Sequence, residues 1–308
     1  MKNFRQIILP SLVMLIGMLS INCHAQQVEA TEADNHTSSV VKKKKKKKKK
    51  KVKLPTIDLS HWKLTIPEGQ GKGKTISVAP PEIMEYATNN VLKPYMYNDS
   101  ASGALVFYAY PSNSTTANTK YSRSELREQM EPGNDNVNWT FAQGAIMKGT
   151  LAMDQTTKDS NGKYHRTIVM QIHGRLTDKQ RELIGQKDNN APPILKIYWD
   201  KGKVRVKTKV LKNLHASEVE MLHEEAWGDD EGHTFEQEVG FRKFKLEVRV
   251  TEGKMVVVLN NSEYAVYENV HMKKWGIFEN YFKAGNYFQS RDPGSFSRVK
   301  FYDLSVSH

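Results

Sequence analysis

From residue 54 onward, apolar and polar side chains alternate with a period of two, the pattern of half-buried β-strands. Residues 203–210 alternate most cleanly, with Lys or Arg at every second position. The apolar segment 194–199 precedes them and residues 200–202 supply a turn, so this stretch predicts a β-hairpin. Residues 244–250 and 255–259 repeat the pattern around a turn at 251–254. Residues 297–306 predict a last strand at the end of the chain.

Helical periodicity is scarce, and we expect only two short helices, near residues 81–86 and 178–185. The segments 129–144 and 174–193 are polar and poor in strand formers, which predicts long loops over a sheet. We find no internal repeat of 20–50 residues. Many short strands separated by turns predict an all-β sandwich or jelly roll.

The first 25 residues have the composition of a secretory signal peptide. A basic start (Lys2, Arg5) is followed by an apolar run over residues 7–19 and by a small-residue ending that fits cleavage after Ala25. The apolar run is too short and interrupted to predict a membrane span. Lipidation of Cys23 is the minority alternative, because Asn22 is a poor fit at such a processing site. Cys23 is the only cysteine, so cleavage would leave the mature protein without any.

The net charge of +12 is concentrated in one tract. Residues 26–53 form a polar spacer that predicts disorder, and its second half contains ten consecutive lysines and Lys53. The tract is read either as a charged linker or as a tether to an anionic surface or polysaccharide. Residues 54–308 are close to neutral and apolar enough for one large all-β domain, so a basic nucleic-acid-binding fold is not supported.

Two segments resemble known metal-binding and phosphate-binding motifs but lack a required residue at the required spacing. Residues 71–75 (GKGKT) lack the first glycine of a phosphate loop, because Glu68 occupies its position. His223 begins a zinc-protease-like HEExx stretch, but residue 227 is Trp rather than the second histidine. The ten histidines show no paired ligand spacing, and we predict no metal site.

Residues 121–128 (YSRSELRE) place two arginines around one glutamate. In an extended strand, Arg123, Glu125 and Arg127 share one face, and Ser124 and Leu126 share the other. Glu125 could hold both guanidiniums in fixed geometry and leave donors free for a carboxylate ligand. The alternative, a solvated charged face, is the more common meaning of such a segment in isolation.

Residues 166–173 (RTIVMQIH) form a second polar and apolar strand pattern. The predicted core face contains Ile168, Met170 and Ile172, and the opposite face contains Val169, Gln171 and His173. Gln171 offers an amide donor, and His173 offers a base near neutral pH. A lone histidine at a strand end is more often structural, and the neighbouring glutamine changes that only slightly.

Residues 280–289 (NYFKAGNYFQ) form a third pattern, with Tyr281, Lys283, Gly285, Tyr287 and Gln289 on one face. Gly285 would leave room for a ligand to approach the strand. A cation such as Lys283 near Tyr287 would favour tyrosinate and lower the pKa of the phenol. Packing alone is the alternative explanation of the alternating Tyr and Phe. The three segments together supply a carboxylate clamp, a base and a phenolic acid, without the pair of carboxylates that glycoside hydrolases use.

The blocks RSELRE (123–128), QIH (171–173) and YFKAGNYFQ (281–289) closely resemble the three signature blocks of the alginate lyases of polysaccharide lyase family 7. The opening at 57–67 and the ending at 299–308 are also similar to the two ends of this family. The resemblance spans residues 55–308 with the blocks in the right order, and the lysine tract lies outside it. It implies a β-jelly roll of two antiparallel sheets, with a concave groove for an anionic uronate chain.

The resemblance implies β-elimination at a 4-linked uronate. In that scheme Arg123 and Gln171 neutralise the substrate carboxylate, with His173 close by. Tyr287 protonates the O4 leaving group. For mannuronate Tyr287 could serve as both base and acid, whereas for guluronate neutral His173 is the better base. Lys283 would tune Tyr287 and contact substrate. Three further residues are expected to support the site or form subsites: Arg127, Glu125 and Gln289.

The resemblance also implies specificity and context. Isoleucine at position 172 of the QIH block is similar to the type that favours guluronate-containing blocks. No cofactor is expected, because Arg and Gln donors would do the neutralisation that a metal does elsewhere. We expect a monomer that is secreted or periplasmic in a bacterium, with alginate rather than nucleic acid as its partner. Two alternatives stay open: a lyase for another polyuronate such as glucuronan, and a non-catalytic carbohydrate-binding jelly roll.

Overall fold

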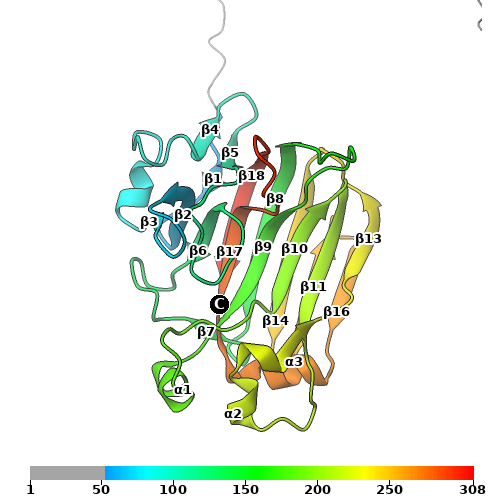
Figure 1. Cartoon of the computed structure of the whole chain (residues 1–308). Helices are drawn as coiled ribbons and strands as arrows, with labels where there is room; N and C mark the ends of the chain where they lie inside the picture. Colours follow the sequence, from blue (N-terminus) through cyan, green and yellow to red (C-terminus); the bar gives the residue numbers. More distant parts are fainter. Residues whose placement is uncertain (1–52) are drawn as a thin grey trace, which may run out of the picture. The chain divides into compact units, whose positions relative to one another are not determined.

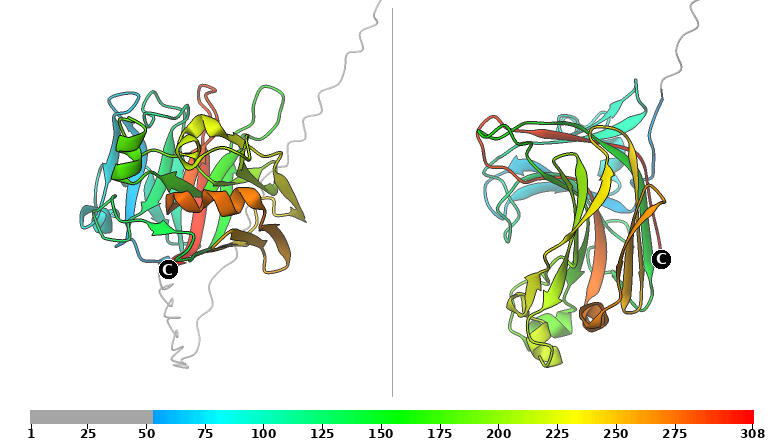
Figure 2. Two further views of the ribbon diagram at one scale, coloured as in Figure 1. Left: turned by 90° about the horizontal axis from the view of Figure 1, so that it is seen from below. Right: turned by 90° about the vertical axis from the view of Figure 1, so that its right-hand side faces the viewer.

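Two β-sheets pack face to face in residues 53–308, the part of the chain that the structure, a computed structural model, describes (Figure 1). The predicted signal peptide and the spacer up to residue 52 lie outside the described residues. We name the two layers the back sheet and the groove sheet; the side view in Figure 2 shows them stacked and curved. All strand pairs are antiparallel except β1 with β18, which run parallel.

The back sheet contains, in spatial order, β16 (Glu263–Tyr267), β15 (Lys254–Leu259), β14 (Phe244–Thr251), β8 (Ala145–Thr156), β18 (Ser297–Ser307), β5 (Ala104–Ala109) and β4 (Met96–Asp99), with β1 (Thr56–Ile57) beside β18. The groove sheet contains β12 (Trp227–Asp229), β11 (Lys203–Leu211), β10 (Leu195–Asp200), β9 (Thr167–Arg175), β17 (Glu279–Phe288), β6 (Arg123–Glu128), β2 (Trp62–Gly69) and β3 (Thr75–Val78), with β13 (His233–Glu238) beside β11 and β7 (Trp139–Thr140) beside β17.

Helices are few and short, as the sequence predicts. The α-helices are α1 (Asp178–Leu183), α2 (Glu218–Met221) and α3 (Val270–Lys274), and the 3₁₀ helices are η1 (Glu82–Glu85), η2 (Glu224–Ala226) and η3 (Trp275–Ile277). The helix expected near 81–86 is thus the 3₁₀ turn η1, and the one expected near 178–185 is α1. No helix among residues 53–308 is long and apolar enough to cross a membrane.

The core lies between the sheets, where alternate side chains of both layers meet. Phe107 and Phe301 meet edge to face with ring centroids 5.6 Å apart, and Leu126 and Phe282 are completely buried beside them in the same apolar cluster. Each fully buried side chain of this size contributes about 1.5–3 kcal/mol through removal from water. The period-two pattern is therefore explained by one face of each strand packing in this core, while the opposite face is free for chemistry.

The predicted hairpins form at the expected positions. β10 and β11 are joined by a two-residue turn in which Lys201 and Gly202 have φ of 53° and 88°. Both left-handed conformations suit the right-handed twist of the flanking strands. β14 and β15 pair around Glu252 and Gly253, and β18 is the predicted last strand. The predicted loop 129–144 contains the short strand β7, and the predicted loop 174–193 contains α1.

The alternation predicted for residues 166–173 is wrong at its beginning. The pairing of β9 shifts register against both β10 and β17 near residue 169. Val169 consequently packs in the core cluster, and Ile168 lines the groove instead. An irregularity of this kind exchanges the two faces of a strand locally. Beyond it the predicted pattern holds, so Met170 and Ile172 are core residues, and Gln171 and His173 face the groove.

Candidate active site

A groove of about 680 Å³ crosses the exposed face of the groove sheet. The three sequence blocks occupy neighbouring strands β6, β17 and β9 in the middle of this sheet. Seven of the eight predicted site residues line the groove: Arg123, Arg127, Gln171, His173, Lys283, Tyr287 and Gln289. The eighth, Glu125, is 1% exposed and bonds three of the lining side chains. Strand pairing thus brings together residues that are up to 164 positions apart in the chain, Arg123 and Tyr287.

Glu125 organises the centre of the groove. One carboxylate oxygen accepts hydrogen bonds from Arg123 Nη1 at 2.7 Å and from Lys283 Nζ at 2.6 Å. The other accepts from Gln171 Nε2 at 2.5 Å. Burial opposes ionisation, but the charges of Lys283 and Arg123 prevail and hold the pKa of Glu125 below its usual value. One buried anion therefore fixes the two cations and the amide.

Arg127 is held differently from the sequence prediction, which assigned both guanidiniums to Glu125. Its nitrogens donate to the Glu128 carbonyl at 2.5 Å, to the Asp135 carbonyl at 2.9 Å and to Asn138 Oδ1 at 2.8 Å. The Glu128 carbonyl is at the end of β6, and the loop after β6 folds back and offers the other two acceptors. Of the two arginines, Glu125 therefore holds only Arg123, and Arg127 belongs to the loop side of the groove.

Arg123 retains two donors without partners. Nε and Nη2 are buried and make no hydrogen bond within residues 53–308. The guanidinium carbon lies 3.7 Å from the centroid of the Tyr287 ring, a cation–π contact. Leaving buried donors unpaired costs about 1–3 kcal/mol. This cost is recovered if an acceptor such as a carboxylate reaches them, which makes Arg123 an anchor for an anionic ligand.

Tyr287 is a neutral phenol in this environment. Burial raises its pKa above the usual value, and the nearby charge of Arg123 offsets only part of that effect. The sequence prediction that Lys283 lowers this pKa is wrong, because burial dominates and the cation in contact is Arg123. A protonated phenol can donate a proton, so the corrected state suits a general acid.

His173 is a neutral imidazole. Burial, together with the nearby charge of Lys283, lowers its pKa to about 3. Nδ1 lies 3.0 Å from the carbonyl oxygen of Gly174, which can only accept, so Nδ1 carries the proton. Nε2 then keeps its lone pair. The arrangement supplies an uncharged base on the same face as Gln171.

Comparison with known proteins identifies the family. The profile of the family described as alginate lyase matches residues 57–308. This chain belongs to the alginate lyases of polysaccharide lyase family 7. It is similar to the solved alginate lyase A1-II′ of that family, at 32% identity with a TM-score of 0.63, covering 82% of this chain and 96% of the other. A curated alginate lyase of Klebsiella pneumoniae is 26% identical over 82% of this chain and 89% of its own length.

Further solved structures extend the likeness. The alginate lyase of Pseudomonas aeruginosa, at 23% identity and a TM-score of 0.59, covers 82% of this chain and 99% of its own, and shows the same fold. Variants of A1-II′ were solved with product (GGG) and with substrate (GGMG), at 31% identity, 82% coverage of this chain, and 96% and 94% of those chains, with TM-scores of 0.64 and 0.63. The fold of the family is the jelly roll expected from the sequence, and the chain is a polysaccharide lyase.

Gly285 of the lyase serves the backbone and not the ligand. Its φ is +137°, and a Cβ there would lie 2.7 Å from the carbonyl oxygen of Ser124 and 3.0 Å from Cα of Glu125. The expectation that Gly285 leaves room for a ligand is therefore wrong. The missing side chain lets β17 approach β6 closely at Glu125.

Ile172, the variable centre of the QIH block, does not reach the groove of the lyase. It is completely buried in the core cluster and lies opposite Leu195 and Phe282 in the sheet. Any influence on specificity must be transmitted through the position of its neighbours Gln171 and His173.

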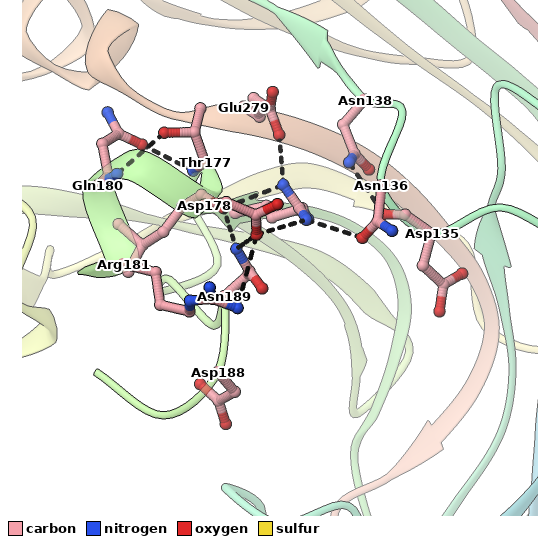
Figure 3. A network of polar contacts seen from close by, with 12 residues as sticks. Asp135, Asn136, Asn138, Thr177, Asp178, Gln180, Arg181, Asp188, Asn189 and Glu279 are labelled. Carbon is pink, nitrogen blue, oxygen red and sulfur yellow. Dashed lines mark hydrogen bonds and ion pairs between the residues drawn. The ribbon is translucent and has the colours of Figure 1, made fainter. Parts of the chain in front are cut away.

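A polar network that the sequence analysis missed contributes several residues to the groove lining (Figure 3). Arg175 donates to Glu279 Oε2 at 2.7 Å and to Asn136 Oδ1 at 2.9 Å, and Asn189 Nδ2 donates to Asp178 Oδ1 at 2.9 Å. Arg175 thereby connects the loop after β6 with the end of β9. The strand alternation His173, Arg175 was the available signal, since both face the groove.

Tyr281 is one of the alternating aromatic residues for which the sequence left packing alone as an explanation. In the lyase its ring lines the groove between two functional side chains, stacked on His173 at 5.3 Å and an interplanar angle of 15°. On its other neighbour, the Arg127 guanidinium carbon lies 4.1 Å from the ring centroid. Tyr281 therefore positions the base and a groove arginine through its ring.

Two substitutions of Tyr281 distinguish the contribution of its ring to activity from that of its hydroxyl. Tyr281→Leu should lower kcat/KM about tenfold, because it removes two contacts worth about 0.5–1.5 kcal/mol each. Tyr281→Phe keeps both contacts and should stay within about threefold of the wild type. Steady-state kinetics with thermal melts measure this. Equal losses in the two variants would show that the hydroxyl matters and the stacking does not.

Proposed function

We propose that this lyase cleaves alginate by β-elimination at 4-linked uronates and gives unsaturated oligosaccharides, with guluronate-containing blocks favoured. The supporting observation is the pair of unpartnered donors on Arg123, fixed by Glu125 beside Gln171, Tyr287 and His173. A buried cation with unused donors is suited to a uronate carboxylate. The contacts between Arg123 and Tyr287 place the anchor and the phenol together.

In the proposed reaction Arg123 and Gln171 bind the carboxylate and stabilise the negative charge that develops when the C5 proton leaves. For guluronate, Nε2 of His173 takes this proton. The C5 electron pair forms the C4–C5 double bond, and the C4–O4 bond breaks. Tyr287 gives its proton to O4, so the charge on the leaving oxygen is neutralised. For mannuronate, Tyr287 carries out both transfers.

The preference for guluronate-containing blocks is supported by the neutral state of His173, since a separate base on the opposite side from the acid is needed there. The complexes of A1-II′ with GGG and GGMG fit this preference. We also propose export, from the signal-peptide pattern of residues 1–25. A mature N-terminus at Gln26 in the secreted or periplasmic fraction would support export.

The deciding experiment measures absorbance at the unsaturated-uronate band with poly-mannuronate, poly-guluronate, alternating alginate and glucuronan as separate substrates. We expect the fastest initial rate on guluronate-containing substrates. Preference for poly-mannuronate would contradict the specificity, and a signal on glucuronan alone would favour the alternative polyuronate. Absence of signal on all four, with retained binding, would leave a carbohydrate-binding module.

The pH dependence is expected to follow Lys283. Burial and the charge of Arg123 lower its pKa to about 8, so the cation is present below pH 8 and is lost as pH rises through this value. We expect kcat/KM to fall above pH 8, because Glu125 then loses one of its two cations. His173 is already neutral above pH 4, so it should add no acid limb between pH 5 and 7.

Lys283→Arg tests this assignment, since arginine stays charged throughout. The alkaline limb should move upward in the variant even if its maximal rate is lower. Lys148→Arg on the back sheet is the control and should keep the wild-type profile. An alkaline limb at the same pH in Lys283→Arg would assign the titration to another group.

A further inference from the structure

Two lysines at the β12 edge of the groove share one aspartate, outside the cluster that the proposed mechanism uses. Lys196 Nζ lies 3.0 Å from a carboxylate oxygen of Asp229, and Lys209 Nζ lies 2.9 Å from the other. Both lysines line the groove, with side chains only 15% and 12% exposed. Both lysine side chains are therefore largely buried in the wall of the groove.

The register of the sheet places Lys196 next to the catalytic centre. Lys196 on β10 is opposite Gln171 on β9, which is opposite Lys283 on β17. Lys283 is in turn opposite Arg127 on β6, and Arg127 is opposite Lys63 on β2. Neighbouring strands are about 4.8 Å apart, comparable to the length of one 4-linked sugar. A polyanion lying across the strands would meet a donor on each of five consecutive strands.

Two ammonium groups at this edge share one carboxylate. Asp229 supplies one negative charge against the two ammonium groups of Lys196 and Lys209. Lys207, opposite Lys196 on β11, adds a third cation, which donates to the carbonyl of Asp230 at 3.3 Å. The Asp230 carboxylate is engaged by Thr208. Glu224 lines the same groove. Burial lowers the pKa of Lys196, which shows the cost of holding this cation in the wall.

This edge of the groove sheet is formed by the segment that connects β11 to β12. Between β11 and β12 it turns through α2 and η2 and returns so that Asp229 pairs directly with Lys209. Ser217 and Glu220 form a reciprocal capping box at the N-terminus of α2, and Trp227 is buried at the start of β12. The aspartate that orders the two lysines is thus fixed by packing as well as by charge.

We propose that Lys196 and Lys209 form a subsite for the carboxylate of a neighbouring uronate in the same polysaccharide chain, with Asp229 orienting the two ammonium groups. The inference rests on the proposed function and adds a binding position beyond the linkage that is cleaved. The subsite gives affinity for chains long enough to reach β10 and β11 and takes no part in proton transfer. Its loss should therefore raise KM for polymer and leave kcat unchanged.

Lys196→Gln and Asp229→Asn test the subsite, because they are expected to change KM for polymeric alginate in different directions. Lys196→Gln should raise KM for polymeric alginate about tenfold, the usual cost of one charge-assisted hydrogen bond, with kcat within twofold. The increase should shrink for the shortest oligomer that is cleaved and as salt is added. Asp229→Asn keeps an amide oxygen that can accept from a lysine and so keeps its orientation, but it removes the competing negative charge, so KM should be at or below the wild-type value. A merely structural ion pair would instead raise KM in both variants.

Wild-type turnover on the polymer is measured first, and its absence would overturn the proposed function and not the subsite alone. Lys148→Gln, which breaks the Lys148–Glu247 pair on the back sheet, is the matched control and should keep the wild-type KM. Thermal melts accompany each variant, and Lys209→Gln replaces Lys196→Gln if the latter does not fold. With active wild type, an unchanged KM in the lysine variant or a raised KM in Asp229→Asn overturns the subsite.

Discussion

Tyr287→Phe is expected to lower kcat about 10³-fold while KM for alginate changes little. Removing one oxygen deletes the proton that the leaving group receives, and general acid–base groups typically contribute 10²–10⁴-fold. The ring remains, so its stacking on Arg123 at 3.7 Å is retained. Initial rates at the unsaturated-uronate band, with binding measured by calorimetry, separate the two effects.

Tyr302→Phe on the back sheet is the matched control, since it removes the same atom outside the groove. We expect wild-type kinetics from that variant. A Tyr287→Phe enzyme with kcat close to the wild type would show that Tyr287 is not the acid. Water or Lys283 would then be the candidate for that role. A large increase in KM with normal kcat would assign the hydroxyl to binding.

Glu125→Gln is expected to destabilise the fold by about 3–5 kcal/mol and to abolish measurable turnover. The substitution keeps the shape but leaves Arg123 and Lys283 buried without their shared anion, the costly way to break a buried ion pair. The anchor for the substrate carboxylate then loses its fixed geometry. Chemical denaturation measures the stability, and the lyase assay measures the activity.

Glu247→Gln on β14 is the control that isolates burial. Glu247 also pairs with one lysine and one arginine, Lys148 and Arg249, but both are about half exposed. Exposed pairs contribute about 0–1 kcal/mol, so this variant should lose no more than that. The double variant Glu125→Gln/Lys283→Met should recover part of the stability without activity, because it removes one unpaired charge. Equal losses at positions 125 and 247 would refute the central role of the buried anion.

The local pattern predicted strands well where alternation was regular. Hairpins at β10–β11 and β14–β15 and the faces of β6 follow from the period-two sequence pattern and from turn residues that tolerate positive φ. The same alternation failed at residue 169, because a register shift depends on how two neighbouring strands pair and not on the strand alone. Gly285 was misassigned for the same reason: its role is set by Ser124 on another strand.

In the candidate site, too, some features follow from the local sequence and others depend on tertiary packing. The sequence by itself determined the residue types in the groove and their order, since the three blocks resemble one family closely and each strand keeps its polar face together. Only the tertiary structure decided that Glu125 holds Lys283 and Gln171, that Arg127 turns to its loop, and that Tyr287 stays protonated. Distances between strands, burial and therefore pKa values depend on packing among segments far apart in the chain, which no local pattern records.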